Sequence, residues 1–304
     1  MKILIKKTIF WIVAFAITLG AAVYQRLTGP TYPIDVEVTS GNEAWSFELP
    51  RSHGGETDCP VEITLPPAFS ADLIYRRYPT NETWDTIRMQ RIGEHLMASL
   101  PNQPPAGKLE YHLEFYEDGR PVPPVLKENV VIRFKGEVPN GALIPHVILM
   151  FLAMLWSNAT GLQAAVGISS YKRNAFITTM LFIVGGLILG PVVQKYAFGA
   201  FWTGWPLGED LTDNKVLASV IIWIVAVWLN RKKDRPWLVI TAALFLFAIY
   251  MIPHSSRGSE LDYTTGEVIT GMILPLALAI RTSWFGGADP KDYLRKTGFK
   301  QHAL

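Results

Sequence analysis

The feature that most constrains this chain is a block of apolar runs between Gly141 and about Phe285. A helix needs about 20 mostly apolar residues to cross the hydrocarbon core of a bilayer, and runs of this kind are typical of membrane-spanning helices. With a further run at the N-terminus, the expected spans are Thr8–Val23, Leu143–Val166, Ala175–Val193, Leu217–Leu229, Pro236–Ile252 and Val268–Ile280. The sequence therefore predicts an α-helical membrane protein with six transmembrane helices.

The first run leaves two alternatives open. Lys2, Lys6 and Lys7 precede it and small residues end it, which describes both an uncleaved anchor and a cleavable signal peptide. We expect residues 1–30 to be one or the other. Either way, the chain from Arg26 onward would begin outside the cytoplasm.

Charge gives the expected orientation. If all six runs span, one side collects most of the basic residues of the short loops and tails, including Lys172, Lys232 and Lys296. Because basic loops stay in the cytoplasm, we expect a multi-pass protein of the bacterial inner membrane. Both termini would be cytoplasmic, with residues 140–285 as the membrane domain and residues 286–304 as a cytoplasmic tail.

The composition agrees with a lipid partner. Apolar residues make up 49% of the 304 residues and charged residues 18%, so the lipid bilayer is an expected partner. The net charge of +2 comes from scattered Lys and Arg. Nucleic acid is therefore not an expected partner, because its binding needs a basic face.

Residues 31–139 have a different pattern. Apolar and polar residues alternate along Ile34–Thr39 and Trp45–Leu49, and Gly41-Asn42 between them favours a hairpin turn. Further alternating segments predict seven or eight strands, which suits an inserted β-sandwich on the periplasmic side. The single Cys59 excludes an intrachain disulfide, so this domain depends on its apolar core.

A family resemblance covers residues 60–120. It is carried by Leu73-Ile74-Tyr75-Arg76-Arg77, Trp84, Met89, Leu100-Pro101, Gly107-Lys108-Leu109-Glu110-Tyr111 and Asp118-Gly119. This stretch resembles fibronectin-type and immunoglobulin-like domains of secreted bacterial proteins. The resemblance implies a sandwich fold and names no activity, since such domains mostly bind, space or present other groups.

Two loops on the expected outer face carry the candidate interaction residues. They are Trp202, Trp205, Glu209, Asp210 and Asp213 in one loop, and Glu260 and Asp262 in the other. In one interpretation the aromatic residues form an interfacial belt and Asp213 or Asn214 caps the next helix. In the other, the acidic residues gather round a cation or the basic patch of a partner, although their spacing matches no calcium-binding loop.

Two histidines suggest a cofactor alternative. His146 and His254 each follow a proline at the expected outer end of a helix, and at similar depth they could be axial ligands of a b-type haem. The alternative is that each is a polar tip at the membrane interface. The sequence has no CxxCH motif for covalent haem, and we expect no other cofactor and no metal site.

Charged residues and catalytic motifs that the sequence lacks limit the functions to be expected. The central parts of the apolar runs contain no Asp, Glu, Lys or Arg, which ion-coupled transporters usually need at mid-membrane. No phosphate-binding Gly-Lys-Ser/Thr stretch, HExxH or serine nucleophile elbow occurs. We expect a non-enzymatic binding or complex-accessory protein whose partner is another cell-envelope protein, with a haem-binding redox subunit as the alternative.

The short linker Gly136–Asn140 predicts how the two domains meet. It reaches at most about 18 Å even when fully extended, so the β domain must sit close to the outer loops. We expect a basic face of the domain to dock on the acidic loops together with Trp202 and Trp205. The expected basic residues are Arg76, Arg77, Arg88 and Arg91.

Single-cysteine labelling tests the orientation. In a Cys59→Ser background, cysteines at positions 84 and 205 should react with a membrane-impermeant maleimide applied from outside. Cysteines at positions 172, 232 and 296 should react only after the membrane is opened. Labelling of position 232 from outside would overturn the expected orientation.

Overall fold

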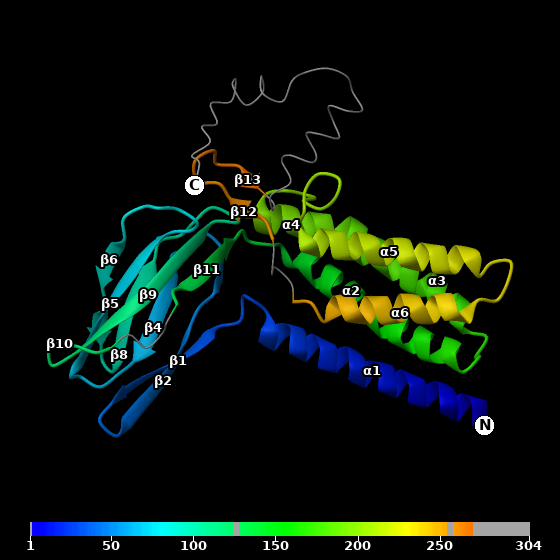
Figure 1. Cartoon of the computed structure of the whole chain (residues 1–304), viewed down its shortest axis with the longest axis horizontal. Helices are drawn as coiled ribbons and strands as arrows, with labels where there is room; N and C mark the ends of the chain where they lie inside the picture. The colour runs from blue at the N-terminus through cyan, green and yellow to red at the C-terminus, as the bar shows by residue number, and fades with distance from the viewer. Residues whose placement is uncertain (1, 124–127, 254–257, 270–304) are drawn as a thin grey trace, which may run out of the picture.

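The computed structural model describes residues 2–123, 128–253 and 258–269. A bundle of helices lies beside a domain of β-strands, and the two parts meet at one end of the bundle (Figure 1). The strands β1 to β11 fall between residues 34 and 135, within the range expected for the soluble domain. The chain enters this domain from α1 and leaves it into α2.

The helices of the bundle follow the apolar runs. They are α1 (Lys2–Thr28), α2 (Asn140–Ala165), α3 (Tyr171–Phe182), the π-helix η1 (Ile183–Leu189), α4 (Gly190–Phe198), α5 (Leu211–Leu229) and α6 (Pro236–Tyr250). The segments α3, η1 and α4 follow one another without a break. Among the residues that the structure describes, four stretches are long and apolar enough to cross a membrane: Thr8–Thr28, Asn140–Ala165, Tyr171–Phe198 and Leu211–Leu229.

The prediction of six transmembrane helices is wrong. The fifth expected run forms α6, which is apolar but has only 15 residues, short of the roughly 20 that a bilayer requires. The sixth expected run begins at Val268, yet Val268 and Ile269 form strand β13, paired with β12 (Glu260–Leu261). β-Branched residues after a turn glycine, here Gly266 at φ 73°, favour such a strand over a helix. Residues 270–280 lie outside the described residues.

The β domain contains strands in three sheets. The strands are β1 (Ile34–Ser40), β2 (Glu43–Leu49), β3 (Ser52–Gly54), β4 (Cys59–Thr64), β5 (Phe69–Arg77), β6 (Asp85–Arg88), β7 (Gln90–Ile92), β8 (His95–Leu100), β9 (Lys108–Glu117), β10 (Arg120–Pro121) and β11 (Val130–Lys135). The largest sheet has the order β3-β11-β9-β5-β6, with β10 paired to β9. The others are the hairpin β1-β2 and the sheet β4-β8-β7.

The expected β-sandwich is therefore also corrected. The chain changes sheets at Met89, because β6 pairs with β5 whereas β7 pairs with β8. Pro50, which has no N–H to donate, directly follows β2 and separates it from β3. The expected Gly41-Asn42 hairpin is confirmed, since Ser40 faces Glu43 across the turn.

One apolar core unites the three sheets. Val38, Ile63, Leu73 and Ile132 are buried in it, and together they represent all three sheets. Tyr111 is also buried there, and its hydroxyl donates to the Pro50 carbonyl at 2.7 Å. Cys59 belongs to the same core, and burial raises the pKa of its thiol to about 11.

Inside the bundle, small and polar residues connect the helices. Gly161 of α2 lies so close to α6 that an added Cβ would be 2.7 Å from the Cβ of Ala243. The Asn158 side chain donates to the hydroxyl of Thr18 at 3.0 Å, which joins α2 to α1. These are the devices that membrane helices use for close packing, because apolar side chains give little preference between lipid and protein.

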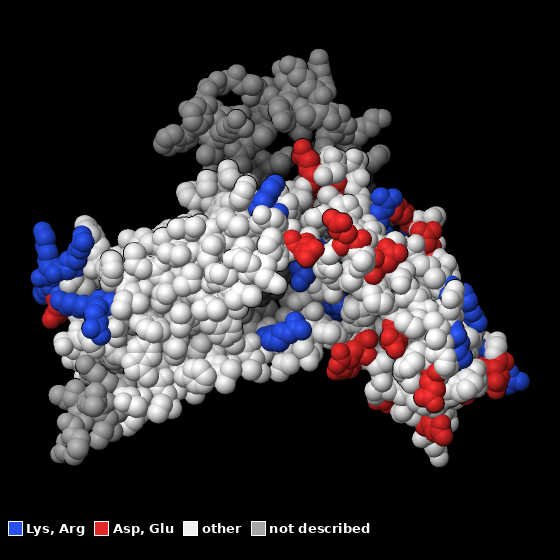
Figure 2. Space-filling model, turned by 180° about the vertical axis from the view of Figure 1, so that it is seen from behind, with Lys and Arg blue, Asp and Glu red and all other residues white. Residues whose placement is uncertain are grey.

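On the surface of the bundle, charged residues and exposed apolar side chains occupy different regions. Figure 2 shows Lys and Arg gathered at the end of the helices far from the β domain, followed by a broad band without charged residues. The basic residues at this end include Lys172 and Arg173 at the start of α3, and Arg231 to Lys233 between α5 and α6. Large apolar side chains are exposed on the helices, as at Ile12 (63%) and Leu244 (64%).

The contact at Gly161 yields a stability prediction. Gly161→Val should lower the melting temperature of the detergent-purified protein, because overpacking of a tight contact costs about 1–3 kcal/mol. Gly20→Val is the matched control, since no atom lies within 4 Å of the added Cβ in α1. Equal melting temperatures for the two variants would contradict the close α2–α6 contact.

Candidate functional site

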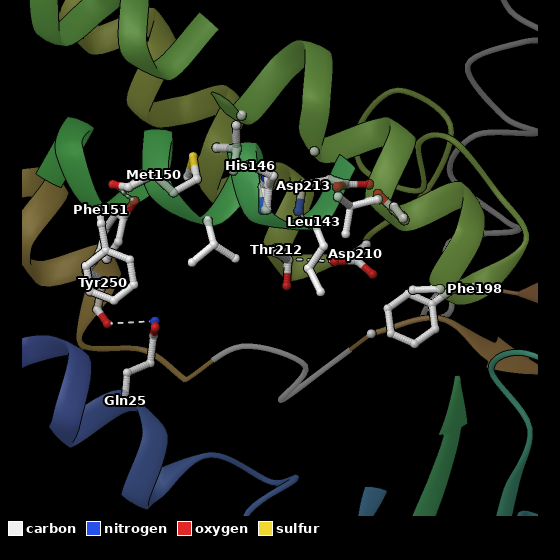
Figure 3. A pocket seen from close by; sticks show the side chains of 18 of the residues that line it. Gln25, Leu143, His146, Met150, Phe151, Phe198, Asp210, Thr212, Asp213 and Tyr250 are labelled. Atoms are coloured by element: carbon white, nitrogen blue, oxygen red, sulfur yellow. Dashed lines mark hydrogen bonds between the residues drawn. The ribbon is translucent and has the colours of Figure 1, made fainter. Parts of the chain in front are cut away.

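A cavity of about 350 Å³ lies where the helices meet the β domain (Figure 3). Side chains from α1, α2, α4, α5, α6 and β11 line it, so segments far apart in the sequence form one site. In Figure 3, Met150, Phe151 and Tyr250 stand at one end of the cavity. Asp210 and Phe198 lie at the other end.

The wall of the cavity is largely apolar. Leu143, Val147 and Met150 of α2 line it from one side, and Val216 of α5 lines it from another. Gln25 of α1 reaches across, where its amide donates to the carbonyl of Tyr250 at 3.0 Å. The site can therefore accommodate an apolar chain next to a polar group.

The π-helix η1 positions His146. Pro191 has no N–H, so the helix cannot keep its regular hydrogen bonds at this point, and the amide of Gly190 donates to the carbonyl of Gly185. The same carbonyl lies 2.8 Å from Nδ1 of His146. Because a carbonyl only accepts, Nδ1 carries the proton and donates. Insertions of this kind often mark functional sites.

Two carboxylates on the rim have structural partners. Asp210 is the N-cap of α5, where its Oδ1 accepts from the amide of Thr212 at 2.7 Å. Asp213 accepts from the amide and the hydroxyl of Thr203 at 2.7 and 3.2 Å. Both side chains are buried, and these bonds hold the loop between α4 and α5 in place.

The β domain contributes one buried, positively charged side chain to the wall of the cavity. Arg133 of β11 is only 6% exposed and its guanidinium stacks over the ring of Phe198, 4.2 Å from the centroid. One terminal nitrogen donates to the carbonyl of Ser259, whereas Nε is buried and has no hydrogen-bond partner among the described residues. Burial lowers the pKa of Arg133, and the more distant Asp210 and Glu260 oppose this shift.

The domain docks on the two loops, as the linker length requires, but through other residues than expected. Lys108 of β9 forms an ion pair with Glu260. The hydroxyl of Tyr263 accepts from the amide of Lys108 at 3.0 Å, and the Leu261 amide donates to the Ala106 carbonyl at 3.1 Å. The hairpin β12-β13 is thereby fixed to the β domain.

The prediction that a basic face of the β domain docks on the loops is wrong for three of the four arginines. Arg76 pairs with Glu110, Arg88 pairs with Asp72, and Arg91 donates to backbone carbonyls beside β5, so all three bind within the β domain. Arg77 alone reaches a loop, where it lies over the ring of Tyr263 at 5.1 Å.

The remaining candidate residues do not form one cluster. The indole of Trp202 donates to the carbonyl of Trp205, whose side chain is 68% exposed. Asp262 accepts from the amide of Thr264, a bond that lowers the pKa of its carboxyl and closes the turn before β13. Glu209 precedes the Asp210 cap and has a partly exposed side chain. His254 lies outside the described residues, so the haem pair with His146 is not tested.

Three residues that the sequence suggested for other roles, Asp210, Asp213 and His146, line this cavity, whereas Arg133 was not among the candidates. The signal was present, since Arg133 is a cation within the apolar stretch Val130 to Phe134, close before the linker. Within the described ranges, no three His, Cys, Asp or Glu residues gather as a metal site would require. No family model, curated protein or solved structure matches this chain.

The Lys108–Glu260 pair can be tested by hydrogen exchange. Glu260→Gln removes the charge, and a partly exposed pair contributes up to about 1 kcal/mol, so amides near Leu261 should exchange up to roughly fivefold faster. Glu267→Gln, at an exposed position of the same hairpin, is the control. If both variants exchange like the unaltered protein, the pair does not hold the hairpin.

Proposed function

We propose that this protein is a non-enzymatic protein of the bacterial inner membrane that binds an amphiphilic component of the cell envelope. In this proposal the helices cross the membrane, the β domain is periplasmic and the cavity at their junction holds the ligand. The cavity carries the proposal, because an apolar wall meets polar groups at the edge of the β domain.

The surface of the bundle supports the membrane placement. Exposed apolar side chains such as Ile12 and Leu244 would face lipid, since a soluble protein rarely exposes so many in one band. The basic end with Lys172 and Arg231 would then be cytoplasmic by the positive-inside rule. The β domain, at the opposite end of the bundle, would be periplasmic.

Binding fits the polar groups better than catalysis does. Asp210 and Asp213 accept hydrogen bonds from backbone amides, and these bonds tie both side chains to the loop between α4 and α5. His146 uses Nδ1 to hold the backbone of η1. These groups shape the wall, and a fixed wall favours selection of a ligand.

The position of the cavity also suits a ligand from the membrane. It is lined by apolar residues of α2, by Val216 of α5 and by Ala22 and Gln25 of α1. The helix α1 enters the β domain at this level (Figure 1). An amphiphile in the bilayer would reach the cavity at the depth where its apolar chain joins its polar head group.

Filling the cavity tests the proposal. Leu143→Trp should reduce the amount of lipid that remains bound to the detergent-purified protein, measured by native mass spectrometry, because the indole occupies the cavity. Ile144→Trp is the matched control, since the neighbouring side chain is 52% exposed and does not line the cavity. Equal lipid retention in both variants would contradict the cavity as the binding site.

A further inference from the structure

We propose that the cavity selects an amphiphile with an oxyanion head group, which Arg133 contacts while the apolar part lies between α2 and α5. This inference rests on the proposed function and specifies its ligand. The observation behind it is a buried cation that lines the cavity without an ion-pair partner among the described residues.

The environment of Arg133 leaves donors unused. A guanidinium has five N–H donors, and a buried one is normally paired because burial of an uncompensated charge is unfavourable. Here one terminal nitrogen reaches the carbonyl of Ser259, and the ring of Phe198 covers one face. Nε is buried without a partner among the residues that the structure describes.

Other positively charged side chains near Arg133 also favour an anion at this place. Lys135 follows Arg133 by two residues on β11, so both point to the same side of the strand. Burial lowers the pKa of Lys135, and the charges of Arg133 and Arg26 lower it further. Figure 2 shows Lys and Arg atoms in the hollow between the bundle and the β domain.

The nearby carboxylates are already engaged. Glu260 pairs with Lys108, and Asp210 caps α5. Both attract Arg133 only from a distance, since neither forms an ion pair with it. A phosphate or carboxylate head group matches the planar donor set of arginine and would supply the missing acceptors.

The apolar wall indicates that the anion is attached to an apolar chain. Leu143, Val147 and Val216 offer no hydrogen bonds, so a hydrated free anion would gain nothing from them. An amphiphile gains from both ends of the cavity. A fixed cation beside an apolar wall thus discriminates between lipids by head group.

Native mass spectrometry of the full chain in detergent can test the head-group class. The probes are phosphatidylglycerol and phosphatidylcholine with identical acyl chains, and inorganic phosphate. The lipid to be counted is the one that Leu143→Trp displaces. The unaltered protein should prefer phosphatidylglycerol by about tenfold, as expected for one or two charge-assisted hydrogen bonds.

Substitutions then assign the preference to Arg133. Arg133→Gln should bind both lipids equally, and Arg133→Lys should restore part of the preference because it keeps the charge. Arg88→Gln, which affects a pair on the edge strand β6, is the control and should behave like the unaltered protein. If Arg133→Gln does not fold, Lys135→Gln serves instead and should reduce the preference about threefold.

The outcomes separate the two proposals. Equal binding of both lipids by the unaltered protein, or an unchanged preference in a folded Arg133→Gln variant, would overturn the anionic head group and leave lipid binding in place. Displacement of the lipid by inorganic phosphate at equal concentration would show that the apolar chain is not needed. Absence of any lipid that Leu143→Trp displaces would refute the proposed function itself.

Discussion

The close contact between Gly136 and the end of α4 is the constraint on which the junction depends. The amide of Gly136 donates to the carbonyl of Ala197 at 3.0 Å, which satisfies one of the carbonyls that a helix leaves free at its C-terminus. A Cβ at this position would be 2.3 Å from the carbonyl oxygen of Tyr196, so only glycine fits. Because Arg133 lies three residues earlier on β11, this contact carries it to the cavity.

Much of the fold could be predicted from periodicity, and the errors have identifiable causes. Alternation located the strands, yet a period of two cannot show that the chain changes sheets at Met89. Apolarity located the helices, yet it does not distinguish a span from the short α6 or from the strand at Val268. The same limit hid Arg133, because alternation alone places it on a solvent face, and only the contacts with Phe198 and Ser259 bury it.

The helix bundle has two halves with different interiors. Towards the basic end, amides and hydroxyls connect the helices, as where Asn174 donates to Gln163 at 2.8 Å and Tyr171 donates to Asn230 at 3.1 Å. Towards the β domain, the helices surround the cavity, and Lys215 donates to the carbonyl of Ile252 just beyond the end of α6. Polar contacts in the first half can hold the helices together while the second half stays open.

The π-helix η1 has a consequence for how this chain could change in length. A wide turn accommodates one residue more than the α-helical path between the same two points requires. Removal of a single residue between Ile183 and Leu189 would therefore shorten the chain without moving the two ends of this segment. Such a deletion would keep the helix continuous but would change the wide turn that presents the Gly185 carbonyl to Nδ1 of His146.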